Sequence, residues 1–281
     1  MLVTLVPLKH VATKKSDECY CEVRRMNVLL EYPLIVLVLC LAVLYLSERI
    51  GVFLGAIRAN INEGERNELN VILSATLTLL SLIIGFTFSM AINRYDQRKN
   101  YEVAEANAIS TEYIRAGLLP DEDAALVRKL LVSYLDQRVL FYETRDDREL
   151  LQIDATTDRL EAGLWSAVQI PAEDQPTPVT SLAVSGMNDV LNSRTNTQGA
   201  WLNRIPSEAW VLMAVVAIFS NLLIGYGMRR TEVARALLFV LPMVVSISFF
   251  LIADIDTPRG GIIHVHPENL ESLSQSFHAN D

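Results

Sequence analysis

The sequence predicts an all-α, polytopic membrane protein, with four transmembrane helices in two pairs that flank a helical soluble domain. Two observations predict this class. The chain of 281 residues is 51% hydrophobic, and its mean hydropathy is +0.27. Its apolar residues gather in long blocks, whereas a soluble domain distributes them. Buried core helices seldom run this far without a charge, so membrane spans are favoured over soluble helices.

Three of the apolar blocks contain no acidic or basic side chain. They are Val71 to Ile92, Trp210 to Met228 and Ala236 to Ala253, with 22, 19 and 18 residues. At about 1.5 Å rise per residue, each is close to the roughly 30 Å thickness of the hydrocarbon core. Each block is therefore a predicted span.

The first apolar block is less uniform than the other three. Leu29 to Leu46 carries Glu31 near its start, and Ser47-Glu48-Arg49 separates it from a second apolar patch, Ile50 to Ile57. A secretory signal is the competing interpretation. The charged leader is long, however, the core exceeds a signal's apolar region, and no small-residue cleavage site follows. We predict a retained span.

The acidic segment between the two pairs is the one part large enough to form a separate water-facing domain. The predicted organisation follows directly from this. Residues 1–28 form an N-terminal tail, either disordered or an over-called start before Met26. Residues 29–92 form the first transmembrane pair, 93–209 the helical domain, 210–253 the second pair, and 254–281 a C-terminal turn and tail.

Within the domain the signals are helical. The second span continues without a breaker to Ala116, where Gly117 and Pro120 end it. A helix then starts with Asp121 as N-cap. Its apolar stripe is wide enough to be buried and consists of Leu126, Val127, Leu130, Leu131, Tyr134 and Leu135. Two further helices are predicted from Asp146 to Gln169 and from Val179 to Asn203, with a proline-rich loop, Pro171 to Pro178, between them.

The orientation depends on the positive-inside rule. With the domain and both ends inside, 11 Lys and Arg residues face the cytoplasm against 6 outside, but a start at Met26 reduces this to 6 against 6. The Met228-Arg229-Arg230 turn favours the opposite topology. We predict a multi-pass protein of the bacterial inner membrane with a cytoplasmic domain. The inside residues are Lys9, Lys14, Lys15, Arg24, Arg25, Arg94, Arg98, Lys99, Arg194, Arg204 and Arg259, and the outside residues are Arg49, Arg58, Arg66, Arg229, Arg230 and Arg235.

Motifs for catalysis are missing from the sequence. There is no Gly-rich phosphate loop, no Gly-x-Ser-x-Gly elbow and no His-Glu-x-x-His. His264-x-His266 lacks a third ligand nearby, and Cys19-x-Cys21 lacks partners at metal-ligand spacing. We therefore expect no enzyme activity, no catalytic residue, no metal and no cofactor. The net charge of −9 argues against nucleic acid as a partner.

A stripe of small and polar residues follows one face of the second span. Its members fall within about 80° of one another on a helical wheel. They are Ser74, Thr78, Ser81, Gly85 and Ser89. Such a face can line an aqueous pore, or it can let helices pack closely. Both interpretations stay open.

A charged face follows on the same helix just beyond the span. Its candidates for an ion pathway or for a domain charge are Arg94, Arg98, Glu102, Glu105 and Glu112. The spacing permits intrahelical ion pairs, so a solvated charged face is the favoured interpretation. In an oligomer, a ring of these acids would instead bias an ion pathway.

The last span ends in a motif of carboxylates and turn residues, Asp254-Ile255-Asp256-Thr257-Pro258-Arg259-Gly260-Gly261. Carboxylates at a membrane exit can coordinate a cation or pair locally, and Pro with Gly-Gly makes the chain turn. We expect Asp254, Asp256 and Arg259 to form local pairs.

These motifs carry a resemblance to a known family. Gly85-Phe86-Thr87-Phe88-Ser89-Met90-Ala91 with Arg94-Tyr95-Asp96, then Glu105-Ala106-Asn107-Ala108-Ile109 and Arg115-Ala116-Gly117-Leu118-Leu119-Pro120, resemble the bestrophin-like membrane proteins of bacteria, whose biochemical activity is unknown. The exit motif is similar too. The resemblance covers roughly residues 29–277 and implies a membrane protein.

The likeness to bestrophin channels themselves rests on the stretch from Arg94 to Lys99, on paired spans around a helical domain, and on the turn after the last span. Those channels are pentameric and conduct anions. The acidic run that completes the calcium clasp of animal bestrophins is absent after Gly261. We predict a homo-oligomer in the lipid bilayer that conducts ions, with the second span lining the axis. The alternative is a non-conducting scaffold or signalling protein whose helical domain binds a partner protein.

Overall fold

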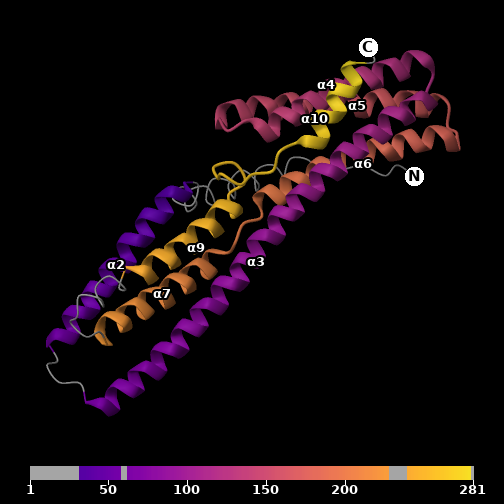
Figure 1. Ribbon diagram of the computed structural model, residues 1–281. Helices are drawn as coiled ribbons and strands as arrows, with labels where there is room; N and C mark the ends of the chain where they lie inside the picture. The colour runs from indigo at the N-terminus through magenta and orange to yellow at the C-terminus, as the bar shows by residue number, and fades with distance from the viewer. Residues whose placement is uncertain (1–31, 58–61, 228–238, 280–281) are drawn as a thin grey trace, which may run out of the picture. The chain divides into compact units, whose positions relative to one another are not determined.

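The computed structural model describes residues 32–57, 62–227 and 239–279, and all secondary structure in these ranges is helical. The chain divides into two compact units (Figure 1). Among the described residues, the membrane unit comprises 32–57, 62–88, 206–227 and 239–262, and the helical unit comprises 89–205 and 263–279. The all-α class predicted from the sequence is confirmed. Residues 1–28, the predicted tail, lie outside the described ranges.

The membrane unit contains α2 (Pro33–Ile57), the first part of α3 (Glu63–Arg115), α7 (Ser207–Gly227) and α9 (Val240–Asp256). Three described helices, α2, α3 and α7, are long and apolar enough to cross a bilayer. Helix α9 overlaps the fourth predicted span from Val240 to Ala253, continues to Asp256 and has 17 residues. That predicted span begins at Ala236, outside the described ranges, so a fourth span stays a prediction.

Helix α2 is longer than the predicted first span. It continues through Ser47, Glu48 and Arg49 and includes the second apolar patch, giving one helix of 25 residues. Glu and Arg are good helix formers, and interior backbone groups keep their hydrogen bonds whatever the side chain. The charged residues therefore interrupt the apolar pattern without ending the helix.

Close backbone contact joins α2 to α7. A Cβ at Gly51 would lie 2.1 Å from the carbonyl oxygen of Leu222, and a Cβ at Gly225 would lie 2.1 Å from the carbonyl oxygen of Glu48. At Gly55, a Cβ would lie 2.6 Å from the Tyr226 carbonyl oxygen. Gly51 and Gly55 are four residues apart, the small-x-x-x-small spacing that lets membrane helices approach closely. The contacts advance in the same direction along both helices, which therefore run parallel.

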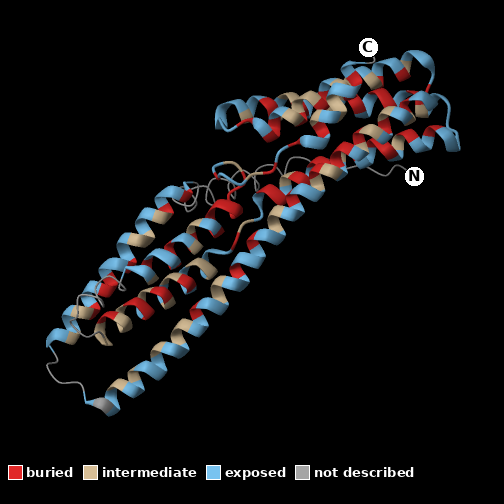
Figure 2. Cartoon of the chain, in the orientation of Figure 1, coloured by how far each residue is buried: buried red, intermediate tan, exposed pale blue. Residues whose placement is uncertain are grey.

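The helical unit is built from the second part of α3, the short 3-10 helix η1 (Ala116–Leu118), α4 (Asp121–Glu143), α5 (Asp147–Asp174), α6 (Pro178–Leu202) and α10 (Glu268–His278). Its buried core follows the predicted stripe on α4. Val127, Leu131, Tyr134 and Leu135 are fully buried, whereas Leu126 is 48% exposed and lies outside the core. The pattern of burial along each helix is visible in Figure 2.

Helix boundaries in this unit differ from the prediction at proline residues. Helix α5 runs through Pro171 to Asp174, although we expected it to end before Pro171. Pro171 is buried and its carbonyl oxygen accepts from Gln175 N at 3.0 Å, so packing offsets the one donor that proline lacks. Pro178 opens α6 behind a Thr177 capping box, a favourable place for proline. Asp121 is the first residue of α4, after Pro120 in the cap position.

The C-terminal segment contains a helix that the predicted turn and tail did not include. Leu270 is fully buried on one face of α10, and the ring of Phe277 stacks on Tyr113 with centroids 4.0 Å apart. On the same helix, Ser274 donates to the Asp136 carboxylate at 2.9 Å. Helix α10 is therefore an integral layer of the helical unit, packed against α3 and α4.

The contact between α2 and α7 predicts that one methyl group added at Gly51 lowers the stability of the protein. Gly51→Ala puts a Cβ onto the Leu222 carbonyl oxygen, where only backbone movement can relieve the overlap, so we expect a loss of about 1–3 kcal/mol in stability. Gly85→Ala is the matched control, because a Cβ at Gly85 meets no atom within 4 Å. Thermal unfolding of the purified protein in detergent measures both. Equal unfolding temperatures for the two variants would contradict the contact.

Candidate functional site

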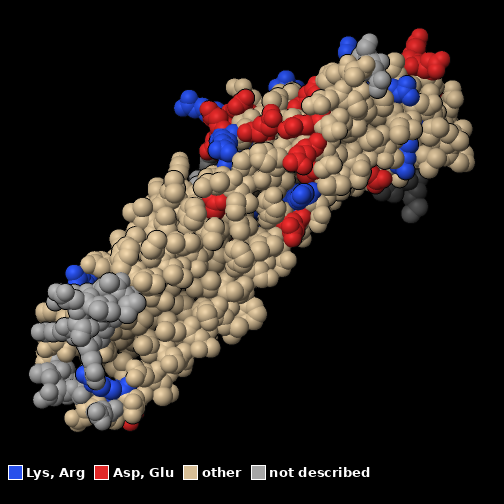
Figure 3. Space-filling view, in the orientation of Figure 1, with Lys and Arg blue, Asp and Glu red and all other residues tan. Residues whose placement is uncertain are grey.

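The first part of α3 leaves most of its surface uncovered within the protomer. From residue 64 to 90, Leu80 and Thr87 are the buried side chains (Figure 2). All five residues of the predicted stripe are exposed, namely Ser74, Thr78, Ser81, Gly85 and Ser89. On the face shown in Figure 3, the described surface of the membrane unit is almost entirely uncharged, and charges gather on the helical unit.

Hydroxyl groups of the stripe bond to the helix itself. Thr78 Oγ1 donates to the Ser74 carbonyl oxygen at 2.8 Å, and Ser81 Oγ donates to the Thr78 carbonyl oxygen at 2.9 Å. These bonds satisfy the hydroxyl donors in an apolar environment, while each oxygen keeps a free lone pair. A polar face of this kind tolerates lipid and can also contact water or an ion.

The predicted charged face is buried, so the expectation of a solvated face is wrong. Arg98, Glu102, Glu105 and Glu112 are each 0–1% exposed. Spacing along one helix could not reveal this, because the partners come from α4, α6 and α10, far away in the sequence. Three of these residues make the contacts with other helices that are described next.

The two arginines hold the C-terminal end of α6. Arg98 donates from Nε to the Ala200 carbonyl oxygen at 3.3 Å and from Nη2 to the Asn203 carbonyl oxygen at 3.4 Å. Arg94 Nη1 donates to the Asn203 side-chain oxygen at 2.8 Å. A helix C-terminus carries unsatisfied carbonyls and a partial negative charge, so cations stabilise it.

Glu102 holds the opposite kind of helix end. Its Oε1 accepts from the backbone N–H groups of Asn269 and Leu270, at 2.9 and 3.0 Å, and its Oε2 accepts from Asn269 Nδ2 at 2.7 Å. The first N–H groups of a helix lack partners and carry a partial positive charge. Glu102 therefore anchors the N-terminus of α10 to α3.

Glu105 is the centre of a buried polar cluster. It forms an ion pair with Arg138 on α4, and its Oε2 accepts from Thr197 Oγ1 at 3.0 Å and from Tyr142 OH at 3.4 Å. Burial lowers the pKa of Arg138, but the negative charge of Glu105, the hydrogen bond to Glu105 and the neighbouring Tyr134 and Tyr142 together outweigh burial and raise this pKa above its usual range. Burial, and then Glu105, raise the pKa of Tyr142. Arg138 is charged and Tyr142 is neutral at physiological pH.

Glu112 differs from these residues because neither of its carboxylate oxygens has a hydrogen-bond partner. It is fully buried against α6, where a Cβ at Gly186 would lie 1.9 Å from its Oε2. Only a residue without a side chain fits at position 186 while this carboxyl group stays in place. An unpaired buried carboxylate is costly, so the neutral form is favoured there.

The exit motif folds back on itself. Asp254 is 2% exposed, and its Oδ1 accepts from the backbone N–H of Ile262 at 2.7 Å. A Cβ at Gly261 would lie 2.5 Å from the Asp254 carbonyl oxygen, so glycine is required where the turn closes. Asp256 is 4% exposed and Arg259 is partly exposed. Asp254 therefore stabilises the turn locally.

A pair of buried polar residues in the membrane unit lies outside the predicted sites. In the membrane unit, Glu48 and Asn221 are fully buried and have unpaired oxygen atoms. The signal in the sequence was an acidic residue inside an apolar block, which marks a functional candidate in a membrane helix.

In the described chain no group of three or more His, Cys, Asp and Glu side chains could hold a metal. The rings of His264 and His266 lie 4.2 Å apart.

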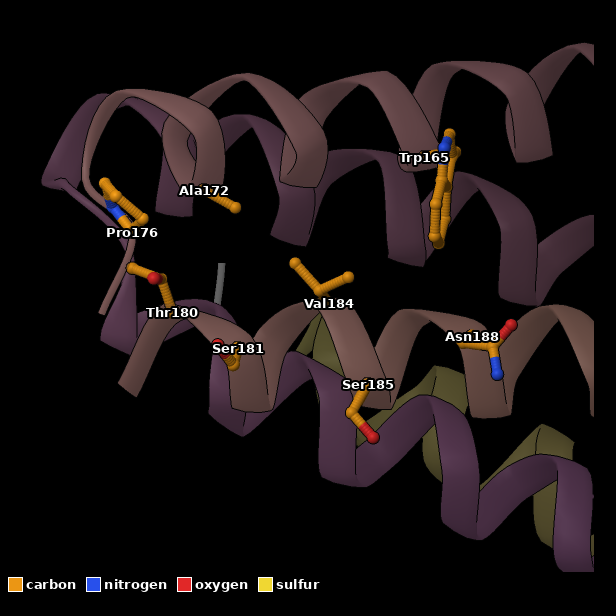
Figure 4. Close-up of a pocket in the computed structure, with 8 residues that line it drawn as sticks. All are labelled: Trp165, Ala172, Pro176, Thr180, Ser181, Val184, Ser185 and Asn188. Atoms are coloured by element: carbon orange, nitrogen blue, oxygen red, sulfur yellow. The ribbon is translucent and has the colours of Figure 1, made fainter. Parts of the chain in front are cut away.

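A pocket of about 430 Å³ lies between the end of α5 and the start of α6 (Figure 4). Trp165 and Val184 contribute apolar walls, and Thr180, Ser185 and Asn188 contribute polar groups. Thr180 Oγ1 already donates to the Gln175 and Thr177 carbonyl oxygens. The pocket has no charged side chain in its lining.

Among the buried glutamates of α3, Glu105 and Glu112 predict opposite mutational effects. Glu105→Gln leaves the Arg138 charge buried without its counterion, and we expect a loss of about 3 kcal/mol or more in stability. Glu112→Gln removes no hydrogen bond and no ion pair, so its unfolding temperature should equal or exceed that of the wild type. Each variant is the control for the other in a thermal unfolding measurement. Equal destabilisation by both would show that Glu112 is paired.

Comparison with known proteins places this arrangement in a family. The model of the bestrophin-like domain matches residues 40–270. Crystal structures of a bacterial bestrophin homolog from Klebsiella pneumoniae share the fold. Two single-site variants give TM-scores of 0.61 and 0.62 at 11% identity, covering 87% of this chain and 97% and 94% of theirs. The structure phased with zinc gives 0.60 at 12% identity, covering 86% and 96%.

No curated protein matches the sequence. At 11–12% identity, the solved structures establish a common fold alone. The family model covers most of the chain, including α3, its charged segment and the exit motif. These matches confirm the resemblance carried by the motifs around Gly85, Glu105 and Asp254. The chain belongs to the bestrophin-like family of membrane proteins.

Proposed function

We propose that this protein is a subunit of a homo-oligomeric ion channel in the bacterial inner membrane, with the α3 stripe lining the ion pathway. The observation that carries the proposal is the exposure of the whole stripe in the protomer. Ser74, Thr78, Ser81, Gly85 and Ser89 are all uncovered. Hydroxyls on such a face can replace part of the hydration shell of an ion.

The alternative use of a small-residue stripe is helix packing, and within the protomer α2 and α7 have that role. The glycines at 51, 55 and 225 would each place a Cβ within 2.6 Å of a backbone atom, whereas Gly85 would meet nothing within 4 Å. The glycine face between α2 and α7 is therefore a packing contact, whereas the face of α3 that contains Gly85 is open. At Gly85 the described part of the chain offers the stripe no close packing partner, so the stripe is available to pack against a second copy of the chain.

The apolar surface that flanks the stripe supports an oligomer. Ile72, Leu79 and Phe86 are 54%, 46% and 63% exposed on α3. Lipid or neighbouring subunits can cover these side chains, whereas the stripe suits water. In a bundle of α3 helices with the stripe facing inward, the stripe contacts water, and lipid or neighbouring subunits cover the apolar side chains. The likeness to bestrophin channels favours conduction over catalysis.

A scaffold or signalling protein is the second candidate function. The observation in its favour is the pocket between α5 and α6, where Trp165 is 37% exposed beside hydroxyl and amide groups. Exposed Trp is typical of protein interfaces. This function would leave the α3 stripe in a dry contact between subunits.

Thiol labelling tests whether the stripe contacts water. Ser81→Cys should react with a small, charged thiol reagent in liposomes, because a pore supplies water and thiolate forms only there. Leu79→Cys is the matched control, since Leu79 is 46% exposed but lies about 160° from Ser81 around the helix, outside the stripe. It should react far more slowly. Native cysteines at 19, 21 and 40 are removed first.

The result that would reject pore lining is equal inertness of both cysteines in a correctly assembled protein. Ser81→Leu then separates the remaining roles. If the stripe packs against a neighbouring subunit, the larger side chain should disrupt the oligomer. If it lines a pore, the oligomer should persist.

The orientation is also a proposal, supported by the positive-inside count and tested by labelling from outside the cell. Gln175 is exposed where α5 ends. With the helical unit in the cytoplasm, Gln175→Cys should resist impermeant thiol reagents in intact cells and react after lysis. Asn62, exposed before α3, is the control position and should show the reverse behaviour. Rapid labelling of Gln175→Cys in intact cells would reverse the orientation.

A further inference from the structure

Two polar side chains on neighbouring membrane helices are buried with unpaired oxygen atoms. Glu48 on α2 and Asn221 on α7 are both 0% exposed. Neither carboxylate oxygen of Glu48 has a hydrogen-bond partner, and the same holds for Asn221 Oδ1. Asn221 Nδ2 donates to the Ala217 carbonyl oxygen at 2.8 Å. The amide nitrogen is thus committed, and the oxygen is left for another group.

Contacts between the two helices bracket these residues. Ser47 Oγ donates to the Ile218 carbonyl oxygen at 2.8 Å. The Glu48 carbonyl oxygen lies 2.1 Å from the position that a Cβ at Gly225 would take. Asn221 lies between Ile218 and Gly225 on α7. Glu48 and Asn221 are therefore at similar depth along the pair.

The helical rotation of each residue brings both to one side of the contact. On α2, Glu48 lies about 60° around the helix from Gly51, which touches α7. On α7, Asn221 lies about 60° from Ile218 in the opposite sense. Since the helices are parallel and face each other, rotations of opposite sense lead to the same side. The helical wheel therefore places both residues on the same side of the contact between α2 and α7.

A carboxylate in this position needs a positive charge nearby. Glu48 is nine residues from the end of α2, so it lies inside a helix that is apolar enough to span the membrane. An isolated buried charge is strongly unfavourable. The neighbouring Arg49 guanidinium lies over the Tyr45 ring, 5.3 Å from its centroid. Tyr226 is the titratable residue nearest on α7, and α9 has no charged residue before Asp254.

We propose that Glu48 and Asn221 bind a small monovalent cation between α2 and α7, either Na⁺ or a proton carried by Glu48. Carboxylate and amide oxygens are hard ligands suited to such ions. The cation neutralises Glu48 and joins α2 to α7. The site lies away from the α3 stripe, and cation binding there does not depend on conduction.

The experiment compares wild-type protein with Glu48→Gln and Asn221→Leu in the same detergent. Glu48→Gln keeps the side-chain size and removes the charge, and Asn221→Leu keeps the size and removes the oxygen. Glu68→Gln, at an exposed position on α3, is the control. Unfolding temperature is measured from pH 6 to 9 in NaCl and in N-methylglucamine chloride at constant ionic strength, and sodium binding is measured with radioactive Na⁺.

If Na⁺ occupies the site, it should raise the unfolding temperature of wild type and the control by about 3 °C or more. The rise and the bound radioactivity should vanish in Glu48→Gln and weaken in Asn221→Leu. If a proton occupies it, Na⁺ has no effect and wild type loses stability as pH rises, whereas Glu48→Gln loses less and keeps only the part that Glu112 contributes. The proposal is overturned if wild type and Glu48→Gln respond alike to both Na⁺ and pH.

Discussion

The unbroken backbone hydrogen bonding of α3 over 53 residues is the constraint on which the rest of the structure depends. A membrane helix must satisfy all its backbone groups internally, and α3 does so from its apolar part into its charged part. In the helical unit, the charged part of α3 turns Glu102 and Glu105 toward their partners. In the membrane unit, the apolar part of α3 carries Ser81 and Gly85 on its exposed stripe.

Electrostatics at helix ends explains why the charged part of α3 is buried. Arg94 and Arg98 meet the carbonyl end of α6, and Glu102 meets the N–H end of α10. Each charged side chain meets the helix terminus whose partial charge is opposite to its own. Glu105 instead uses Arg138, Thr197 and Tyr142. These contacts hold α4, α6 and α10 on one side of α3, so the segment acts as the spine of the helical unit.

The sequence was sufficient for the features that depend on local pattern. The helical class, the continuity of α3 to Arg115 and the core positions of α4 all follow from spacing at 3.6 residues. Solvation of the charged face was predicted wrongly because the partners of Arg98 and Glu105 come from remote segments. Helix α10 was missed, although Leu270 and Phe277 lie seven residues apart on one face after Pro267. The pairing of α2 with α7 could not be predicted, since glycine spacing shows a packing face without its partner.

The central claim is that α3 lines an ion pathway in an oligomer, and flux through the purified protein tests it most directly. The protein is reconstituted into liposomes, and ion flux is measured together with oligomer mass in the detergent used for reconstitution. The account predicts a defined oligomer and an ion flux well above that of empty liposomes. A folded oligomer with flux at the empty-liposome level, under several ions and voltages, would contradict it.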